Sequence, residues 1–338
     1  MSDELIDTDR LNAYFADHAP QLGALRSVQK FGDGQSNPTF LLTTTTGQVV
    51  LRRQPAGELL KSAHAVDREF RVLQALEHSA VPVAAPIHLC TDRDVLGCLF
   101  YLMGYAPGRI FWDPTLPELS ASERGRIYDE MNRVLVALHE VDVVAVGLEE
   151  FGRPGNYFER QVSRWSRQYR ASETETLAAM DHLIEWLPAN MPPDDAQVSL
   201  IHGDYRIDNL VFDASDARVT AVLDWELSTL GHPYADLAYQ CMQWRMPRDC
   251  VLPGLGDADR AALGIPEEAS YVARYCDRRG LDGIPNWAFY LAFSYFRFAA
   301  ILQGVKKRAL EGNASSDKAM AYGDLAPLLA RDAVALID

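Results

Sequence analysis

The chain has 338 residues, 48% of them hydrophobic and 23% charged, which suits two modest lobes with a well-buried core. A formal net charge of -15 argues against a nucleic acid or an anionic membrane as the main partner. The five cysteines are scattered without CxxC spacing, and the acidic N-terminus lacks a signal-peptide pattern. We therefore expect neither a disulfide framework nor a zinc site, and we expect a cytoplasmic location.

Residues 27–53 predict three strands separated by a glycine-bearing turn and a tight turn at Thr46 and Gly47. The first turn is FGDGQSN, residues 31–37, which contains Gly32 and Gly34. Because glycines let the backbone approach a phosphate closely, this loop is a candidate cover for a nucleotide. A plain hairpin turn uses the same residue types and is the commoner explanation of such a loop taken alone.

Residues 67–78 predict a helix with Phe70, Leu73 and Leu76 on one face and Glu69 near that apolar side. A strand pair follows around residues 86–103, and the apolar run then meets a glycine- and proline-rich stretch that predicts a hinge. We place a domain boundary near Gly104, with a nucleotide-binding lobe at residues 1–104 and a catalytic and substrate lobe at residues 105–338.

The second part of the chain is predicted to be mostly helical. Capping boxes are predicted at Ser120 with Glu123 and at Ser172 with Glu175. The segment 287–302 is strongly apolar but too short to span a bilayer, so we expect a buried helix.

Between the two predicted caps, the segment RQVSRWSRQYR places three arginines on one helical face. These are Arg160, Arg164 and Arg167, and Trp165 lies among them. A solvated face is the commoner explanation for such a pattern, and binding of an anionic group is the alternative.

The stretch 200–226, LIHGDYRIDNLVFDASDARVTAVLDWE, carries the most specific chemistry. Three short strands are predicted at 198–201, 210–212 and 219–223, the last two as a hairpin. Asp204 and Asn209 then lie in a loop and Asp224 at a strand end, so we expect their oxygens to converge. Phosphoryl transfer needs a group that orients the acceptor hydroxyl, and hard oxygen ligands for Mg2+. The alternative, that these residues only form turns, is disfavoured by their spacing.

The motif HGDYRIDN resembles the catalytic loop of the aminoglycoside phosphotransferase and choline kinase group, and VLDWE resembles its metal-binding strand end. The resemblance implies an α+β, bilobal protein-kinase-like fold with a small β-rich N-lobe and a larger, mainly helical C-lobe. It also implies ATP and Mg2+ as cofactors. Asp204 would be the catalytic base, Asn209 and Asp224 magnesium ligands, and Glu226 an assistant to a second metal.

The same resemblance implies supporting and nucleotide-binding positions. Asp236 in LGHPYADLAYQ would hold the catalytic loop through its backbone, whereas His202 and His139 are expected to be packed residues rather than bases. Arg52 stands where a lysine is expected, and Glu69 would be its partner. The nucleotide-binding positions implied are Gly34, Ser36, Asn37, Arg52, Glu69 and Met103.

A closer resemblance covers nearly the whole chain. The segments VLRRQPAGELLKSAHAVDREFRVLQAL, RQVSRWSRQY and VLDWELSTLGHPYADLAY are similar to the kinase-like domain fused ahead of acyl-CoA dehydrogenase domains in some eukaryotic proteins, and to bacterial stand-alone relatives. This resemblance implies a hydroxylated acyl substrate, such as a 4-hydroxyacyl thioester. No Rossmann-type strand, glycine loop and helix unit is evident, so dehydrogenase activity is not expected.

The resulting prediction is a small-molecule kinase that transfers the ATP γ-phosphate to a substrate hydroxyl. One alternative is an aminoglycoside phosphotransferase, and another is a catalytically silent, kinase-like nucleotide-binding module, suggested by Arg52 and the incomplete glycine loop. A metal-dependent phosphohydrolase is disfavoured, because this loop offers too few histidine ligands. The sequence does not predict an oligomeric state.

Overall fold

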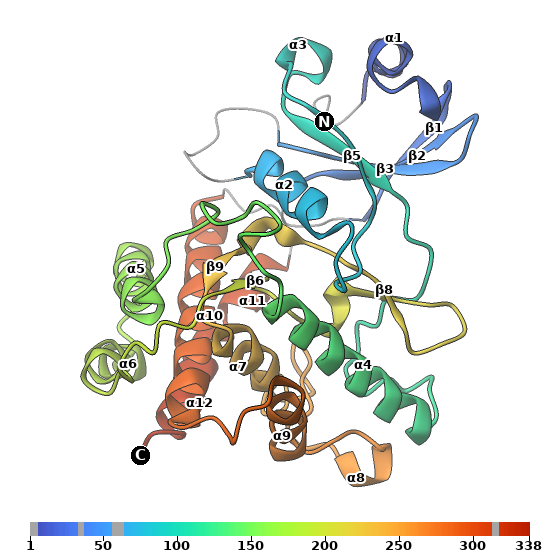
Figure 1. Ribbon diagram of the computed structural model, residues 1–338. Helices are drawn as coiled ribbons and strands as arrows, with labels where there is room; N and C mark the ends of the chain where they lie inside the picture. The colour runs from blue at the N-terminus through green and yellow to red at the C-terminus, as the bar shows by residue number, and fades with distance from the viewer. Residues whose placement is uncertain (1–5, 33–36, 56–63, 313–317) are drawn as a thin grey trace. The chain divides into compact units, whose positions relative to one another are not determined.

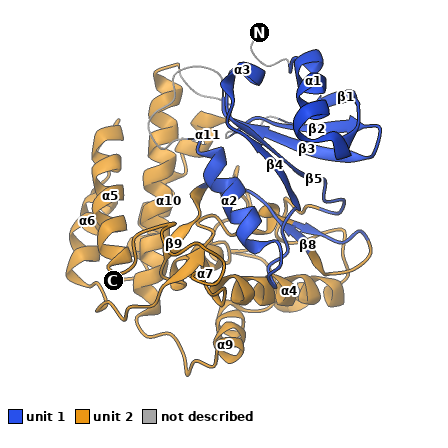
Figure 2. Cartoon of the chain, turned by 45° about the horizontal axis from the view of Figure 1, so that its top comes forward, with its two compact units in different colours: residues 1–109, 211–214, 220–226 blue, residues 110–210, 215–219, 227–338 orange. Residues whose placement is uncertain are grey.

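The structure is a computed structural model that describes residues 6–32, 37–55, 64–312 and 318–338 (Figure 1). Residue contacts divide the chain into two compact units (Figure 2). Unit 1 comprises residues 1–109, 211–214 and 220–226, and unit 2 comprises residues 110–210, 215–219 and 227–338. Two short pieces of the second half of the chain therefore belong to the N-terminal unit.

Unit 1 is built on a five-stranded antiparallel sheet with the order β1-β2-β3-β5-β4. The three strands predicted in residues 27–53 and the tight turn at Thr46 and Gly47 are present, whereas residues 33–36 of the first predicted turn lie outside the described residues. In the turn between β2 and β3, the Thr44 N–H donates to the Gly47 carbonyl at 2.8 Å. The strands are β1 (Leu25–Lys30), β2 (Thr39–Thr44), β3 (Gln48–Arg53), β4 (Pro86–Cys90) and β5 (Phe100–Gly104).

The two faces of this sheet are covered by different helices (Figure 1). On one face, α1 (Thr8–His18) shares a buried cluster with Leu51 and Leu102. On the other, Phe70 of α2 (Val66–Leu76) packs on the Tyr101 ring, with ring centroids 5.7 Å apart. Because successive side chains of a strand alternate between faces, the register of β3 and β5 decides which residues turn toward α2.

Unit 2 is mostly helical and is organised around the long helix α10 (Trp287–Leu310). This helix has the length and apolar composition of a membrane-crossing segment, but 78% of its most apolar window is buried inside the protein. The buried helix predicted here is therefore confirmed. The helices packed against α10 are α5 (Tyr157–Ser172), α6 (Ala178–Ala189), α7 (Tyr234–Met242), α11 (Ala319–Gly323) and α12 (Ala326–Val334).

Short strands carry the motif-bearing stretch. The predicted hairpin is formed by β7 (Leu210–Phe212) and β8 (Val219–Val222). The predicted strand β6 (Ser199–Ile201) pairs with β9 (Thr229–Gly231). The sequence pattern did not indicate β9, because its segment TLG contains one apolar side chain and no apolar run. The mixed fold, with an antiparallel sheet in the N-terminal region and helices in the C-terminal region, agrees with the predicted class. The remaining helices are α3 (Arg93–Leu96), α4 (Ala121–His139), α8 (Arg260–Leu263), α9 (Glu268–Arg279) and the 3-10 turns at Pro20–Leu22, Ile207–Asn209 and Trp225–Leu227.

One of the two predicted capping boxes is present. At the start of α4, the Ser120 hydroxyl accepts from the Glu123 N–H, and the Glu123 carboxylate accepts from the Ser120 N–H at 3.0 Å. The prediction at Ser172 is wrong. This residue ends α5 and its hydroxyl donates to the Tyr169 carbonyl at 3.0 Å, so it is occupied within its own helix.

The Ser120→Ala substitution is expected to lower the free energy of unfolding by about 0.5–2 kcal/mol, because it leaves an N-terminal backbone N–H of α4 without its cap. Urea denaturation measures this change. Ser122→Ala, two residues further along and exposed, is the matched control and should be close to neutral. Equal losses in the two variants would contradict the capping role.

Candidate functional site

In unit 1, the register of the sheet brings several buried polar side chains together. Arg52 pairs with Tyr101 across β3 and β5, and both side chains reach Glu69 on α2. The Arg52 Nε lies 2.8 Å from Glu69 Oε2, although its N–H is not aimed well enough for a directed hydrogen bond. The Tyr101 hydroxyl donates to the same oxygen at 3.1 Å, and Asn37 Nδ2 donates to Oε1 at 2.6 Å. The predicted ion pair between Arg52 and Glu69 is therefore present.

The same guanidinium also holds the carboxylate at the end of β8. The Arg52 Nη2 lies 2.6 Å from Asp224 Oδ1 and 3.8 Å from Glu226 Oε2. Burial by itself lowers the pKa of Arg52, but the carboxylates of Asp224 and Glu69 outweigh burial and raise the pKa well above its ordinary value. One permanently charged side chain thus lies among three carboxylates. Asp224 has a φ of 62°, a left-handed conformation that few residues other than glycine adopt.

The structure describes only some of the other positions that the resemblance assigns to nucleotide binding. Met103 lies in β5, half-buried, opposite Val50 of β3. Asn37 is buried, and its side chain contacts both Glu69 and His64, with His64 Nδ1 3.0 Å from Asn37 Oδ1. Gly34 and Ser36 lie outside the described residues. A nucleotide-binding role for these positions stays a prediction.

In unit 2, a buried carboxylate shapes the loop that follows β6. Asp236, fully buried on α7, accepts the His202 N–H at 2.6 Å and the Gly203 N–H at 2.8 Å. The φ of Gly203 is 83°, and a Cβ there would lie 2.7 Å from the Leu227 carbonyl oxygen. Only glycine fits this conformation and this close approach without strain. Asp236 holds the loop backbone, as the resemblance implied.

This loop presents the Asp204 carboxylate between two hydrogen-bond donors. The Tyr239 hydroxyl donates to Oδ1 at 2.7 Å, and Asn209 Nδ2 donates to Oδ2 at 3.1 Å and to the Asp204 carbonyl at 2.9 Å. Since the amide nitrogen of Asn209 is used in this way, its Oδ1 remains as an acceptor without a partner among the described residues. The structure thus brings Asp204 and Asn209 together in unit 2, and Asp224 and Glu226 around Arg52 in unit 1.

Two residues of this site were missed from the sequence. Tyr239 lies three residues after Asp236 on α7, so the two side chains share a helix face. Arg297 of α10 donates from Nη2 to the Gly203 carbonyl at 2.7 Å, and its guanidinium lies 5.3 Å from the Tyr239 ring and 5.8 Å from the Trp165 ring. The signals in the sequence were the helical spacing from Asp236 and a cation inside an apolar helix.

The histidines pack as expected. His139, buried in the last turn of α4, has Nδ1 2.8 Å from the Tyr275 hydroxyl and Nε2 3.5 Å from Asp236 Oδ2. Burial lowers the pKa of His139, an effect that outweighs the opposing influence of Asp236. His202 is also buried, and its Nδ1 accepts the Asp204 N–H at 3.2 Å. Both rings therefore support the loop.

The three arginines predicted on one face of α5 have different surroundings. Arg160 donates to the carbonyls of Gly155 and Arg153, and Arg167 donates to the Ser163 carbonyl at 3.3 Å. Arg164 is exposed, with its guanidinium 5.4 Å from the Trp165 ring. In the described part of the chain, none of the three forms an ion pair.

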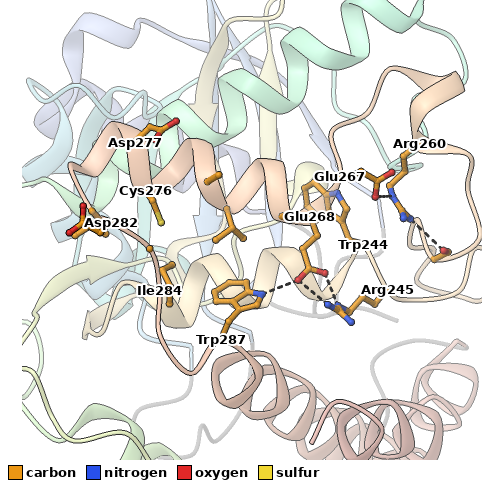
Figure 3. Close-up of a pocket in the computed structure, with 16 residues that line it drawn as sticks. Trp244, Arg245, Arg260, Glu267, Glu268, Cys276, Asp277, Asp282, Ile284 and Trp287 are labelled. Atoms are coloured by element: carbon orange, nitrogen blue, oxygen red, sulfur yellow. Dashed lines mark hydrogen bonds and ion pairs between the residues drawn. The ribbon is translucent and has the colours of Figure 1, made fainter.

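A pocket of about 910 Å³ lies elsewhere in unit 2, against α9 (Figure 3). Its polar groups satisfy one another. Glu268 accepts from Arg245 at 2.6 Å and from the Trp287 indole N–H at 2.9 Å, and Arg260 pairs with Glu267. None of the described residues that line it belongs to the predicted site, so this pocket does not contribute to the site chemistry.

The His139 environment makes stability depend on pH. Its pKa in the folded protein is below the ordinary value of 6.5, so acidification protonates the unfolded chain first. The contribution of neutral His139 to the free energy of unfolding is therefore fully present above about pH 6.5, and it is lost as the pH falls toward the lowered pKa of the folded state. Urea denaturation between about pH 7 and about pH 5 should show this loss. The His139→Gln substitution should reduce the slope of the free energy of unfolding against pH. His182→Gln, on the exposed side of α6, is the control; an unchanged slope in His139→Gln would contradict the assignment.

Comparison with known proteins agrees with the resemblance. Residues 27–292 match the phosphotransferase enzyme family, APH. Acyl-CoA dehydrogenase family member 10 of Mus musculus is 49% identical over 302 residues, covering 89% of this chain and 28% of that protein. Acyl-CoA dehydrogenase family member 11 of Homo sapiens is 42% identical over 335 residues, covering 98% of this chain and 43% of that protein. The chain thus spans less than half the length of these relatives.

Solved structures show the same fold. A Ralstonia eutropha protein named for the aminoglycoside phosphotransferases has a crystal structure with a TM-score of 0.89, 48% identity and 98% coverage of both chains. A thermostable mutant of aminoglycoside phosphotransferase APH(4)-Ia, in complex with ADP and hygromycin B, has a TM-score of 0.64 at 16% identity, covering 96% of this chain and 98% of that one. With its HGDYRIDN loop and VLDWE strand end set in this fold, the chain belongs to the phosphotransferase enzyme family and has its kinase-like architecture.

Proposed function

We propose that this chain is a kinase that transfers the γ-phosphate of ATP to the hydroxyl group of a small molecule. The observation that carries the proposal is the half-buried Asp204 carboxylate, held by Tyr239 on one oxygen and Asn209 on the other. Phosphoryl transfer leaves little covalent chemistry to the protein and depends on positioning and charge neutralisation. A carboxylate held in this way is suited to orient an acceptor hydroxyl and to accept its proton.

The residues around Arg52 are proposed to hold the nucleotide. A guanidinium is a forked donor that can clamp phosphate oxygens, and the Glu69 contact keeps it in place, as a lysine and its glutamate partner do in protein kinases. Asn37 supports this arrangement through its bond to Glu69. Met103, Gly34 and Ser36 are proposed as further nucleotide contacts on the resemblance alone.

The donor set fits a hard divalent cation. Asp224 and Glu226 carry carboxylate oxygens in unit 1 and are proposed as ligands, and Asn209 is proposed as a further ligand on the resemblance alone. Among the described residues, no group of three or more acidic, cysteine or histidine side chains forms a complete metal cage. Mg2+ commonly takes one or two carboxylates together with phosphates and water, and Asp224 and Glu226 offer two carboxylates. Bound Mg2+ would neutralise charge on the phosphate oxygens.

We further propose a hydroxylated acyl compound with an anionic group as the substrate. The relatives named as acyl-CoA dehydrogenase family members support an acyl substrate. The basic–aromatic cluster formed by Arg164, Trp165, Tyr239 and Arg297 supports the anion. Arg297 lies over the rings of Trp165 and of Tyr239, which bonds Asp204, and Arg164 lies over the Trp165 ring. Arg297 is 5% exposed, and its contacts among the described residues include no carboxylate. A polycationic amino sugar would meet like charge there, although the name of the Ralstonia eutropha relative makes it the second candidate.

We propose a reducing compartment for this protein and a small molecule as its partner. The five cysteines are free, which supports a reducing compartment such as the cytoplasm. The net charge supports a small molecule rather than a nucleic acid or an anionic membrane as partner.

Asp204→Asn is expected to lower the turnover number for phosphoryl transfer by about 100- to 10,000-fold, because the variant cannot accept the acceptor proton. The measurement is ATP consumption with hydroxyacyl-CoAs, amino sugars and choline-like alcohols as acceptors. Asp216→Asn, in the exposed hairpin turn, is the matched control and should keep wild-type turnover. Full turnover in a folded Asp204→Asn variant would refute the role of Asp204.

Thermal stabilisation by ATP is expected to require Mg2+. In Asp224→Asn the magnesium-dependent part should be lost, because a neutral amide is a weaker ligand for a hard cation. Melting temperatures with ATP alone, Mg2+ alone and both together measure this effect. No response of the wild-type protein to any nucleotide would contradict the nucleotide binding on which the kinase proposal rests.

A further inference from the structure

Helix α7 contacts the Asp204 loop at two levels. The Asp236 carboxylate takes the backbone N–H groups of His202 and Gly203. One helical turn later, the Tyr239 hydroxyl reaches the Asp204 side chain itself, 2.7 Å from Oδ1. Because residues three apart share a helix face, a single surface of α7 holds both the backbone and the functional carboxylate of this loop.

The Tyr239 hydroxyl is suited to act as a permanent donor. The residue is 4% exposed, and burial together with the charge of Asp204 raises the pKa of Tyr239 well above its ordinary value. The hydroxyl therefore keeps its proton and donates it to the carboxylate, a charge-assisted hydrogen bond of the stronger kind.

The Arg297 guanidinium packs over the ring of Tyr239. This guanidinium lies 5.3 Å from the Tyr239 ring and 5.8 Å from the Trp165 ring, within the range of cation–π attraction. The same side chain donates to the carbonyl of Gly203, the residue before Asp204, at 2.7 Å. One buried cation thus links the tyrosine ring to the loop that the tyrosine holds.

The two donors leave room for a third. Tyr239 uses one lone pair on Oδ1 and Asn209 uses one on Oδ2, whereas an ionised carboxylate offers about four. The rotation of the carboxylate is therefore determined while acceptor capacity remains for the substrate hydroxyl. Resting on the proposed kinase function, we infer that Tyr239 is a positioning residue. It fixes the Asp204 carboxylate where that group orients the acceptor hydroxyl for attack on the γ-phosphate and takes its proton, and Arg297 supports Tyr239.

The first test compares Tyr239→Phe with Tyr271→Phe in the full-length protein. Tyr271 is a matched control, since its buried hydroxyl also bonds a side chain, Gln240 Oε1 at 2.9 Å, but does not contact Asp204. The assay is magnesium-dependent ATP hydrolysis with water as the acceptor. Tyr239→Phe is expected to lower kcat by about 10-fold with KM for ATP within about 2-fold of wild type, because the nucleophile is misplaced while ATP is still bound. Tyr271→Phe is expected to change neither constant, and equal kcat losses in the two variants would overturn the inference.

The second test asks whether Tyr239 acts through Asp204. In an Asp204→Ala background, Tyr239→Phe should cause no further loss of kcat, because the group that it positions is gone. A 10-fold loss in both backgrounds would show that Tyr239 acts independently and would overturn the inference.

The third test does not need turnover. In a crystal structure of Tyr239→Phe, the Asp204 carboxylate should leave Asn209 Nδ2 or occupy more than one rotamer, whereas in Tyr271→Phe it should stay in place. An unmoved carboxylate in Tyr239→Phe would overturn the inference. If the wild-type protein turns over ATP neither with water nor with any alcohol acceptor, the kinase proposal fails, and this structural comparison still decides whether Tyr239 positions Asp204.

Discussion

The buried carboxylate of Asp236 is the group on which the rest of the site in unit 2 depends. Burying a charge without partners is expensive, so its full burial requires the N–H groups of His202 and Gly203 and the nearby His139 ring. These bonds determine the path of the chain just before Asp204. The left-handed conformation of Gly203 then turns the next residue toward Tyr239 and Asn209. The reactive geometry follows from this one compensated charge.

Unit 1 also contains a buried charge that needs partners, but this charge is positive. The buried cation is Arg52, and the carboxylates of Glu69 and Asp224 compensate it. Removing one member of such a group leaves an unpaired buried charge, which strongly destabilises the folded protein. The lysine expected in this family is replaced by a broader, forked donor that can reach two carboxylates at once. The chain thus keeps the electrostatic role of that position with different geometry.

The family and the fold leave the substrate open, because kinase-like folds hold one phosphate-transfer chemistry and vary in the residues that meet the acceptor. In this chain the residues next to Asp204 are basic and aromatic. Arg297 and Arg164 both stack on Trp165, and Arg297 also stacks on Tyr239. This basic and aromatic cluster supports the proposal of an anionic, partly apolar acceptor rather than a polycation. The substrate proposal depends on this local chemistry together with the relatives.

The sequence by itself determined the strands and the core helix α10, because apolar periodicity and length reflect local burial. It also determined the Asp204 and Asn209 pair, since the two lie five positions apart in one loop, and the partnership of Arg52 with Glu69 through the resemblance. Only the tertiary structure decided the contacts of Tyr239 and Arg297 with the Asp204 loop and the absence of a capping box at Ser172. The physical reason is that these contacts join helices far apart in sequence, or depend on which of two nearby partners a hydroxyl takes, and periodicity carries no information about either.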